Sequence, residues 1–289
     1  MRPLANDTDL ATEGIYLALW RARTPQQKLQ ALAETTAALR TVVAGRLYTD
    51  TSAAVATVTN MRAYLARRLY AWEVADQVGE EKEAGAAMAP NPIAVTLLVA
   101  DYLDQLAIPY LIGGSLASSV YGVPRATMDT DLLIALSRDQ ASALVRKLSD
   151  AFYVSHEAAM DAVRRRSSFN AIHLASMWKV DLFVSRGRPY DRAQLARREP
   201  QVVATEPRRT LFFATAEDTI LTKLEWFRLG NEVSDRQWAD ILSVMKLRGA
   251  HLDHAYLLRW AATLDLADLL ERARQDAGPL WSADDGQPT

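Results

Sequence analysis

The stretch Asp129-Thr130-Asp131-Leu132-Leu133-Ile134 joins an acidic start to a strongly apolar end. Side chains of a strand alternate between two faces, so Asp129 and Asp131 share one face and the apolar residues share the other. We therefore predict a strand over residues 130–135. Two neighbouring carboxylates repel unless a cation or proton lies between them, and their hard oxygens suit Mg²⁺ or Mn²⁺. The alternative is a solvated Asp pair at a loop edge, which the apolar continuation disfavours.

A glycine-containing turn precedes this strand. Gly113-Gly114-Ser115 follows the short apolar run Tyr110-Leu111-Ile112, which we predict to be a buried strand, and leads into a predicted helix starting near Leu116. Glycines let the backbone approach a ligand closely, and a helix N-terminus offers free N–H groups to phosphate oxygens. The turn is thus a candidate phosphate site. Its alternative role is a tight strand-to-helix connection with Ser115 as the N-cap.

A third acidic residue follows in the chain. Trp178-Lys179-Val180-Asp181-Leu182-Phe183-Val184 alternates as a strand, and residues 169–175 form a predicted hairpin partner for it. An Asp within so apolar a strand is costly to bury unless it pairs or binds a metal, although an exposed strand face is the alternative. Three acidic side chains on neighbouring strands beside a phosphate-binding turn suit two-metal phosphoryl or nucleotidyl transfer. Asp129, Asp131 and Asp181 are therefore the candidate metal ligands.

Helical patterns flank this segment on both sides. The candidate caps Asn91, Thr215 and Ser234 predict helix starts before apolar periodic runs. We predict an α+β fold, in which a catalytic core with a small mixed sheet lies between N-terminal and C-terminal helical regions. The predicted divisions are a helical domain over 1–79, a linker over 80–91, the core over 92–212, a helical bundle over 213–277 and a flexible tail over 278–289.

Composition excludes several other classes. The 289 residues carry 33 Lys+Arg against 35 Asp+Glu, are 49% hydrophobic and include no Cys. The absence of Cys rules out disulfide scaffolds, thiolate metal sites and Cys nucleophiles, so a metal here is expected to be a hard ion held by oxygen. We find no signal peptide and no run of the roughly 20 apolar residues that a membrane span needs. The sequence therefore predicts a cytoplasmic protein without membrane association.

Together, the Gly-Gly-Ser turn, the Asp-x-Asp strand and the later strand Asp resemble the core of the DNA polymerase β-like nucleotidyltransferase superfamily. The spacing from Ser115 to Asp129, with the segment Gly122-Val123-Pro124-Arg125-Ala126-Thr127, looks like the AbiEii-type toxin branch. The resemblance covers about residues 92–248. A departure is Gln237, which stands where that branch is expected to have an Asp.

The resemblance implies roles for particular residues. Gly113, Gly114 and Ser115 would hold the triphosphate of an NTP, with Arg125, Lys223 and Asp240 as further nucleotide-site residues. Asp129, Asp131 and Asp181 would hold two Mg²⁺ or Mn²⁺ ions, and Asp181 would help to deprotonate the acceptor hydroxyl. Asp129, Asp131, Asp181 and Lys223 are thus the expected catalytic residues.

The implied activity is transfer of a nucleoside monophosphate from an NTP to a hydroxyl acceptor. The acceptor is left open between an RNA 3′ end, with tRNA as the example that the family suggests, a protein side chain and an antibiotic. A toxin or phage-defence role, with a cognate protein partner, comes from the resemblance alone. A local excess of Lys and Arg between Met160 and Arg209 agrees with either phosphate or RNA contact or a solvated surface. The alternative function is an inactive nucleotidyltransferase-fold module, or an antitoxin-like protein, that binds a partner.

Overall fold

The computed structural model describes residues 4, 10–50 and 91–278. These residues combine helices with seven strands, which confirms the predicted α+β class. They group into two compact units that interleave along the chain. The first unit draws on Met1–Leu32, Leu111–Arg125 and Gly187–Thr289, and the second draws on Ala33–Tyr110 and Ala126–Arg186. The predicted linear division into domains stays a prediction. The part of its N-terminal helical domain over 51–79, most of its linker over 80–91 and its tail from 279 lie outside the described residues.

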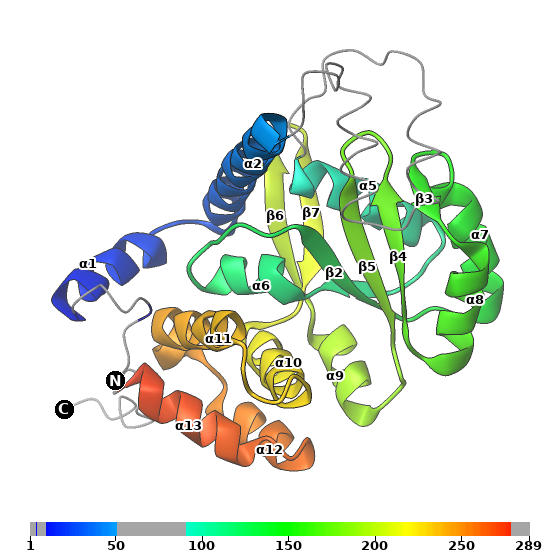
Figure 1. Cartoon of the computed structure of the whole chain (residues 1–289). Coiled ribbons are helices and arrows are strands. Elements are labelled where there is room, and N and C mark those ends of the chain that lie inside the picture. Colours follow the sequence, from blue (N-terminus) through cyan, green and yellow to red (C-terminus); the bar gives the residue numbers. More distant parts are fainter. Residues whose placement is uncertain (1–3, 5–9, 51–90, 279–289) are drawn as a thin grey trace. The chain divides into compact units, whose positions relative to one another are not determined.

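The second unit contains four paired strands. β2 (Asp129–Ile134) runs parallel to β5 (Trp178–Val184), β5 is antiparallel to β4 (Ser168–His173), and β4 is antiparallel to β3 (Phe152–Val154). The predicted strand over 178–184 is confirmed, and the strand predicted over 130–135 begins and ends one residue earlier. The unit also contains α5 (Pro92–Gln105), α7 (Arg138–Leu148) and α8 (His156–Arg165). Figure 1 shows α7 and α8 lying along β3 and β4.

Burial of one face of β2 orients its acidic residues. Thr130, Leu132 and Ile134 are fully buried, whereas Asp129 and Asp131 on the other face are partly exposed. The buried Thr130 hydroxyl accepts a hydrogen bond from Trp178 Nε1 at 3.0 Å and shares another with Thr96 of α5, also at 3.0 Å. Since its polar atoms are satisfied inside the core, this face is fixed, and the period of two then sets the direction of both carboxylates.

The first unit contains the remaining strands. The chain enters it at β1 (Tyr110–Ile112), where Ile112 pairs in parallel with Phe213 of β7 (Arg208–Phe213). β7 is antiparallel to β6 (Glu199–Thr205). The helices are α1 (Leu10–Arg21), the start of α2 (Pro25–Asp50), α6 (Gly114–Tyr121), α9 (Pro189–Arg197), α10 (Ala216–Leu229), α11 (Asp235–Arg248), α12 (His254–Thr263), α13 (Ala267–Ala277) and the short 3₁₀ helix η1 (Gly249–His251).

Side-chain caps start the helices that the sequence predicted. Asn91 accepts from Ile93 N at 3.0 Å, Thr215 accepts from Asp218 N at 3.1 Å, and Ser234 caps α11 in the same way. Each cap satisfies an N–H group that a helix end would otherwise leave unpaired. The three predicted helix starts are therefore confirmed.

Buried contacts join α11 to other helices of the first unit. Phe227 of α10 and Trp238 of α11 lie with ring centroids 5.0 Å apart. Lys246 of α11 forms a buried ion pair with Glu13 of α1, with Nζ 2.9 Å from Oε2. Within the described ranges, no helix is long and apolar enough to cross a membrane.

Candidate functional site

Three aspartates lie on the neighbouring parallel strands β2 and β5. Asp131 stands directly opposite Asp181, and Asp129 stands opposite Lys179. The Asp181 side chain is 13% exposed and that of Asp129 is 34% exposed. The strand register thus places the three acidic residues that the sequence singled out on two neighbouring strands.

A lysine ammonium lies between two of these carboxylates. Lys179 Nζ is 2.7 Å from Asp181 Oδ2 and 3.6 Å from Asp129 Oδ2. Thr127 Oγ1 donates to the other Asp129 oxygen, Oδ1, at 3.1 Å. Adjacent carboxylates need a cation to offset their repulsion, and Lys179 supplies one from the same face of β5 as Asp181.

The environment raises the pKa of Asp181. Burial raises the pKa of this carboxyl above its ordinary value, Lys179 acts in the opposite direction, and the negative charge of Asp129 adds to the increase. A carboxyl with a raised pKa is a better proton acceptor once it is ionised, which suits a group that takes a proton from a hydroxyl.

The aspartates fit a divalent metal by donor chemistry, since carboxylate oxygens are the ligands that Mg²⁺ and Mn²⁺ prefer. In the described part of the chain, however, no three His, Asp or Glu side chains are grouped closely enough to hold a metal ion as they stand. Lys179 occupies the position of a counter-ion to Asp129 and Asp181. Binding a metal at these residues would therefore require the ammonium group to move.

The Gly-Gly-Ser turn joins β1 to α6 in the first unit. Gly114 has φ +55°, a conformation that favours glycine, and a Cβ atom on Gly113 would meet no atom within 4 Å. The helix predicted to start near Leu116 is present as α6, which begins two residues earlier, at Gly114. Ser115 consequently lies in the first turn of the helix and is not its N-cap, which is Gly113. The backbone beside Gly113 is left open to a ligand.

Four residues predicted for nucleotide binding form one hydrogen-bonded network in the first unit. Arg125 Nη2 donates to Ser115 Oγ at 2.8 Å. Arg125 also binds both oxygens of Asp240, each at 2.7 Å, and Lys223 Nζ lies 2.8 Å from Asp240 Oδ2. This network, Ser115–Arg125–Asp240–Lys223, joins α6, the segment after it, α10 and α11.

Charge and burial give the network a net positive character. The side chains of Lys223 and Asp240 are 9% and 6% exposed, whereas that of Arg125 is 28% exposed. Burial alone would raise the pKa of Asp240, but hydrogen bonds and charge from Arg125 and Lys223 hold it below its ordinary value. Two cations thus share one ionised carboxylate. Arg125 is held in one orientation and keeps an exposed part that can meet an anion.

Two contributors escaped prediction from the sequence. Lys179 lies on the Asp181 face of β5, so the strand alternation placed it there, but nothing in the pattern showed that it would pair with Asp129. Thr127 lies before β2 in a segment without periodicity. The Lys179–Asp129 contact depends on how two strands meet, which one segment of sequence does not specify, whereas the Thr127 hydroxyl bonds to Asp129 within its own segment.

Comparison with known proteins gives no family assignment. No family model matches the chain, and no curated protein matches it. Among solved structures, the chain is similar to an antigenic nucleotidyltransferase-like protein from Paracoccidioides brasiliensis, at 18% identity and TM-score 0.42, with coverage of 62% of this chain and 90% of that one. It is also similar to the antibiotic-resistance factor ANT(2″)-Ia, at 14% identity and TM-score 0.39, with coverage of 63% and 98%. Neither similarity assigns a function to this chain.

Proposed function

We propose that the chain is a nucleotidyltransferase that uses Mg²⁺ or Mn²⁺. It transfers a nucleoside monophosphate from an NTP to a hydroxyl, with release of pyrophosphate. The observation that carries the proposal is the placement of Asp129, Asp131 and Asp181 on one face of two parallel strands, with a cation already between two of them. Such a carboxylate group fits the charge distribution of phosphoryl transfer, in which cations offset negative charge on the phosphates.

The proposal gives each group of residues a separate role. Asp129, Asp131 and Asp181 would hold the divalent ions, which when bound polarise phosphoryl oxygens and lower the pKa of the attacking hydroxyl. Asp181 would also help to accept the proton of that hydroxyl. The Gly113-Gly114-Ser115 turn and Arg125 would bind phosphate oxygens. Lys223 and Asp240 would keep the Arg125 guanidinium in place.

The finer assignments rest on the motif resemblance. The AbiEii-type branch, a toxin or phage-defence role, and an RNA such as tRNA or a protein as acceptor remain parts of the proposal. The cytoplasm is the compartment in which such a protein would find its NTP.

One observation favours a second candidate, an inactive module that binds a partner protein. Lys179 already pairs with Asp129 and Asp181, so these carboxylates have a counter-ion without metal. In this alternative the lysine is a permanent replacement for the ion, and the chain binds neither metal nor nucleotide.

Isothermal titration calorimetry with MnCl₂ separates the two candidates. We expect the wild-type chain to bind Mn²⁺, Lys179→Met to bind it at least tenfold more tightly because the competing ammonium is gone, and Asp131→Asn to bind it at least tenfold more weakly. Lys147→Met, which removes a lysine of the second unit that bonds to Gln105, is the matched charge control. No Mn²⁺ binding at millimolar concentration by the wild type and by Lys179→Met would support the inactive module.

A further inference from the structure

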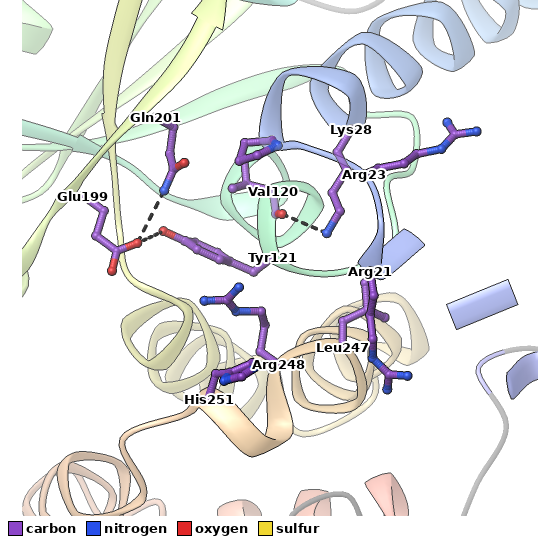
Figure 2. A pocket seen from close by; sticks show the side chains of 11 residues that line it. Arg21, Arg23, Lys28, Val120, Tyr121, Glu199, Gln201, Leu247, Arg248 and His251 are labelled. Atoms are coloured by element: carbon purple, nitrogen blue, oxygen red, sulfur yellow. Dashed lines mark hydrogen bonds between the residues drawn. The ribbon is translucent and has the colours of Figure 1, made fainter. Parts of the chain in front are cut away.

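A pocket in the first unit lies among residues that the proposed function does not use. Its volume is about 260 Å³, and it is lined by the α1–α2 connection, the C-terminal end of α6, β6 and the end of α11 with η1 (Figure 2). We call it the basic pocket, because its lining includes Arg21, Arg23, Lys28 and Arg248. His251 also lines it.

The lining of the pocket carries little negative charge, and the carboxylate that supplies it already accepts hydrogen bonds from neighbouring side chains. Glu199 is the one acidic residue among the described residues that line the pocket. Its carboxylate accepts a hydrogen bond from Tyr121 OH at 2.9 Å and another from Gln201 Nε2 at 3.4 Å. Burial raises the pKa of Tyr121, and Glu199 raises it further, so the phenol stays protonated and remains a donor to this carboxylate. The pocket thus carries an excess of positive charge.

Lys28 is the most informative residue of the basic pocket. It is 5% exposed, and its ammonium donates to the backbone carbonyl of Val120 at 3.1 Å. Burial and, to a smaller extent, the positive charge of Arg248 together lower the pKa of Lys28 to about 8. Among the ion pairs of the described residues, none involves Lys28 or Arg248. A buried ammonium that faces a second cation without a carboxylate is unfavourable, and an anion in the pocket would remove the imbalance.

We propose that the basic pocket binds a compact anion that carries phosphate groups. Lys28 supplies a point charge from the wall, and Arg248 supplies a planar fork of donors, which matches two phosphate oxygens at once. Arg248 also lies over the Tyr121 ring, with 5.8 Å from its guanidinium carbon to the ring centroid. Pockets for drug-sized ligands measure roughly 300–1,000 Å³, so the smaller volume here favours an ion of the size of pyrophosphate.

This pocket is separate from the residues assigned to nucleotide and metal. Val120 and Tyr121 are at the C-terminal end of α6, whereas Gly114 and Ser115 are at its N-terminal end. None of the pocket residues belongs to the Ser115–Arg125–Asp240–Lys223 network or to the three aspartates. The proposal therefore goes beyond nucleotidyl transfer and does not depend on it.

Titration of the full chain with inorganic pyrophosphate, followed by calorimetry and ³¹P NMR in buffer with EDTA, tests this proposal. EDTA removes divalent ions, so binding through metal at the aspartates does not contribute. We expect saturable binding in the wild type whose affinity falls roughly tenfold or more in Lys28→Met and in Arg248→Met, since each removes a charge-assisted contact of the basic pocket that the Gly113-Gly114-Ser115 turn and Arg125 do not share. Inorganic phosphate should bind the same site more weakly.

Two controls make the result specific. Arg146→Met removes an exposed cation of α7 outside the pocket, and Asp129→Asn disables the proposed metal site, so both should keep the wild-type affinity. Arg248 is exposed, so its variant carries the test even if Lys28→Met fails to fold. The proposal is overturned if the wild type shows no saturable binding, if Arg146→Met weakens binding as much as Arg248→Met does, or if citrate binds as tightly as pyrophosphate.

Discussion

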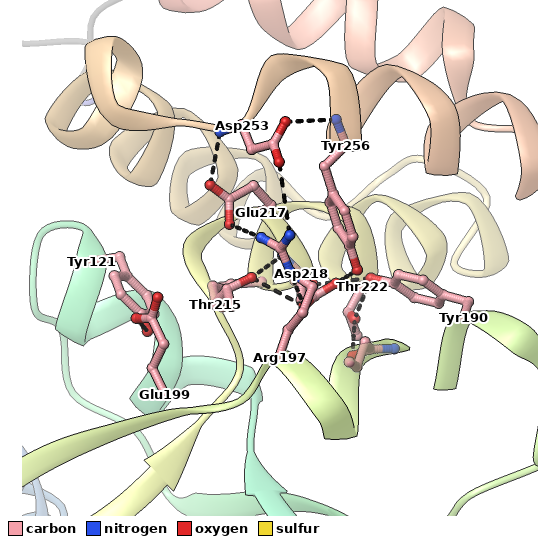
Figure 3. A network of polar contacts seen from close by, with 12 residues as sticks. Tyr121, Tyr190, Arg197, Glu199, Thr215, Glu217, Asp218, Thr222, Asp253 and Tyr256 are labelled. Carbon is pink, nitrogen blue, oxygen red and sulfur yellow. Dashed lines mark hydrogen bonds and ion pairs between the residues drawn. The ribbon is translucent and has the colours of Figure 1, made fainter. Parts of the chain in front are cut away.

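The buried carboxyl of Asp218 makes stability depend on pH in a direction that can be worked out from its contacts. Tyr256 OH donates to Asp218 Oδ1 at 2.8 Å, Thr215 Oγ1 donates to Oδ2 at 3.0 Å, and Arg197 lies 4.0 Å from the same oxygen (Figure 3). Burial raises the pKa of Asp218 to about 6, although these neighbours act against it. The folded chain thus holds the proton of Asp218 more tightly than the unfolded chain, whose value is the ordinary 3.8.

The direction and size of this pH dependence follow from the difference in proton binding between the folded and unfolded states. Between about pH 4 and pH 6 the folded state binds more protons than the unfolded state, so the free energy of unfolding falls as the pH rises. The stabilisation is complete below the ordinary pKa and is lost as the pH passes the raised one. At about 1.4 kcal/mol for each pKa unit, the difference between the ordinary and the raised pKa corresponds to about 3 kcal/mol in the free energy of unfolding. Asp218→Asn keeps the shape and cannot ionise, so it removes this dependence.

Urea unfolding at pH 4, 5, 6 and 7, followed by tryptophan fluorescence, measures the effect. Trp260 reports on this region because its ring centroid is 6.2 Å from that of Tyr256. We expect wild type to lose about 3 kcal/mol relative to Asp218→Asn between pH 4 and pH 7. Asp268→Asn is a control in which the change of stability with pH should have the opposite direction, since the hydrogen bond from Arg228 lowers the pKa of that exposed carboxyl. A difference between wild type and Asp218→Asn that stays constant over this range would refute the reasoning.

Three further substitutions test other parts of the fold. Gly122→Ala should cost about 1–3 kcal/mol, measured by urea unfolding, because its Cβ would lie 2.8 Å from the carbonyl oxygen of Ser118. Glu13→Gln leaves the buried Lys246 ammonium without its carboxylate, so we expect a loss of about 3–5 kcal/mol in the same assay, and a loss below 1 kcal/mol would contradict this. Asp240→Asn should destabilise by about 3 kcal/mol at pH 7 and by less on acidification, because its pKa is lowered in the folded state and its contribution is lost as the pH falls.

The parts of the fold predicted from sequence are those set by local chemistry. Asn91, Thr215 and Ser234 cap their helices because a short polar side chain before an apolar periodic run has few other arrangements. Alternation likewise predicted β5 over residues 178–184 and the burial of one face of β2.

The missed elements have weaker local signals. β6 begins Glu199-Pro200 and β7 begins Arg208-Arg209, and charged residues and proline are not typical of a strand. The pairing of Phe213 with Ile112 of β1 places β7 beside β1. Helix α9 has little apolar periodicity, and it is held in place by Tyr190, whose hydroxyl donates to the backbone carbonyl of Asp218. These elements depend on contacts between distant segments, which the period of a single segment does not reveal.

The candidate site was likewise predicted from the sequence only in part. The sequence predicted that Asp129, Asp131 and Asp181 would share a face, and the parallel register of β2 and β5 brings Asp131 opposite Asp181. The insertion of Lys179 between two of the carboxylates, and the pairing of Arg125 with Asp240, depend on side chains from different elements. These contacts decide how a ligand would be held, and the structure supplies them.

Transfer of label from α-³²P NTPs tests the central claim most directly. The wild-type chain is incubated with Mg²⁺ and each NTP, in parallel with total RNA, total protein and small hydroxyl compounds, and is compared with the Asp129→Asn, Asp131→Asn double variant. The proposed function predicts a labelled acceptor that requires the divalent ion and disappears in the variant, while the far-UV circular dichroism spectrum is unchanged. Absence of labelled product with every NTP and acceptor, or equal labelling by the double variant, would contradict it.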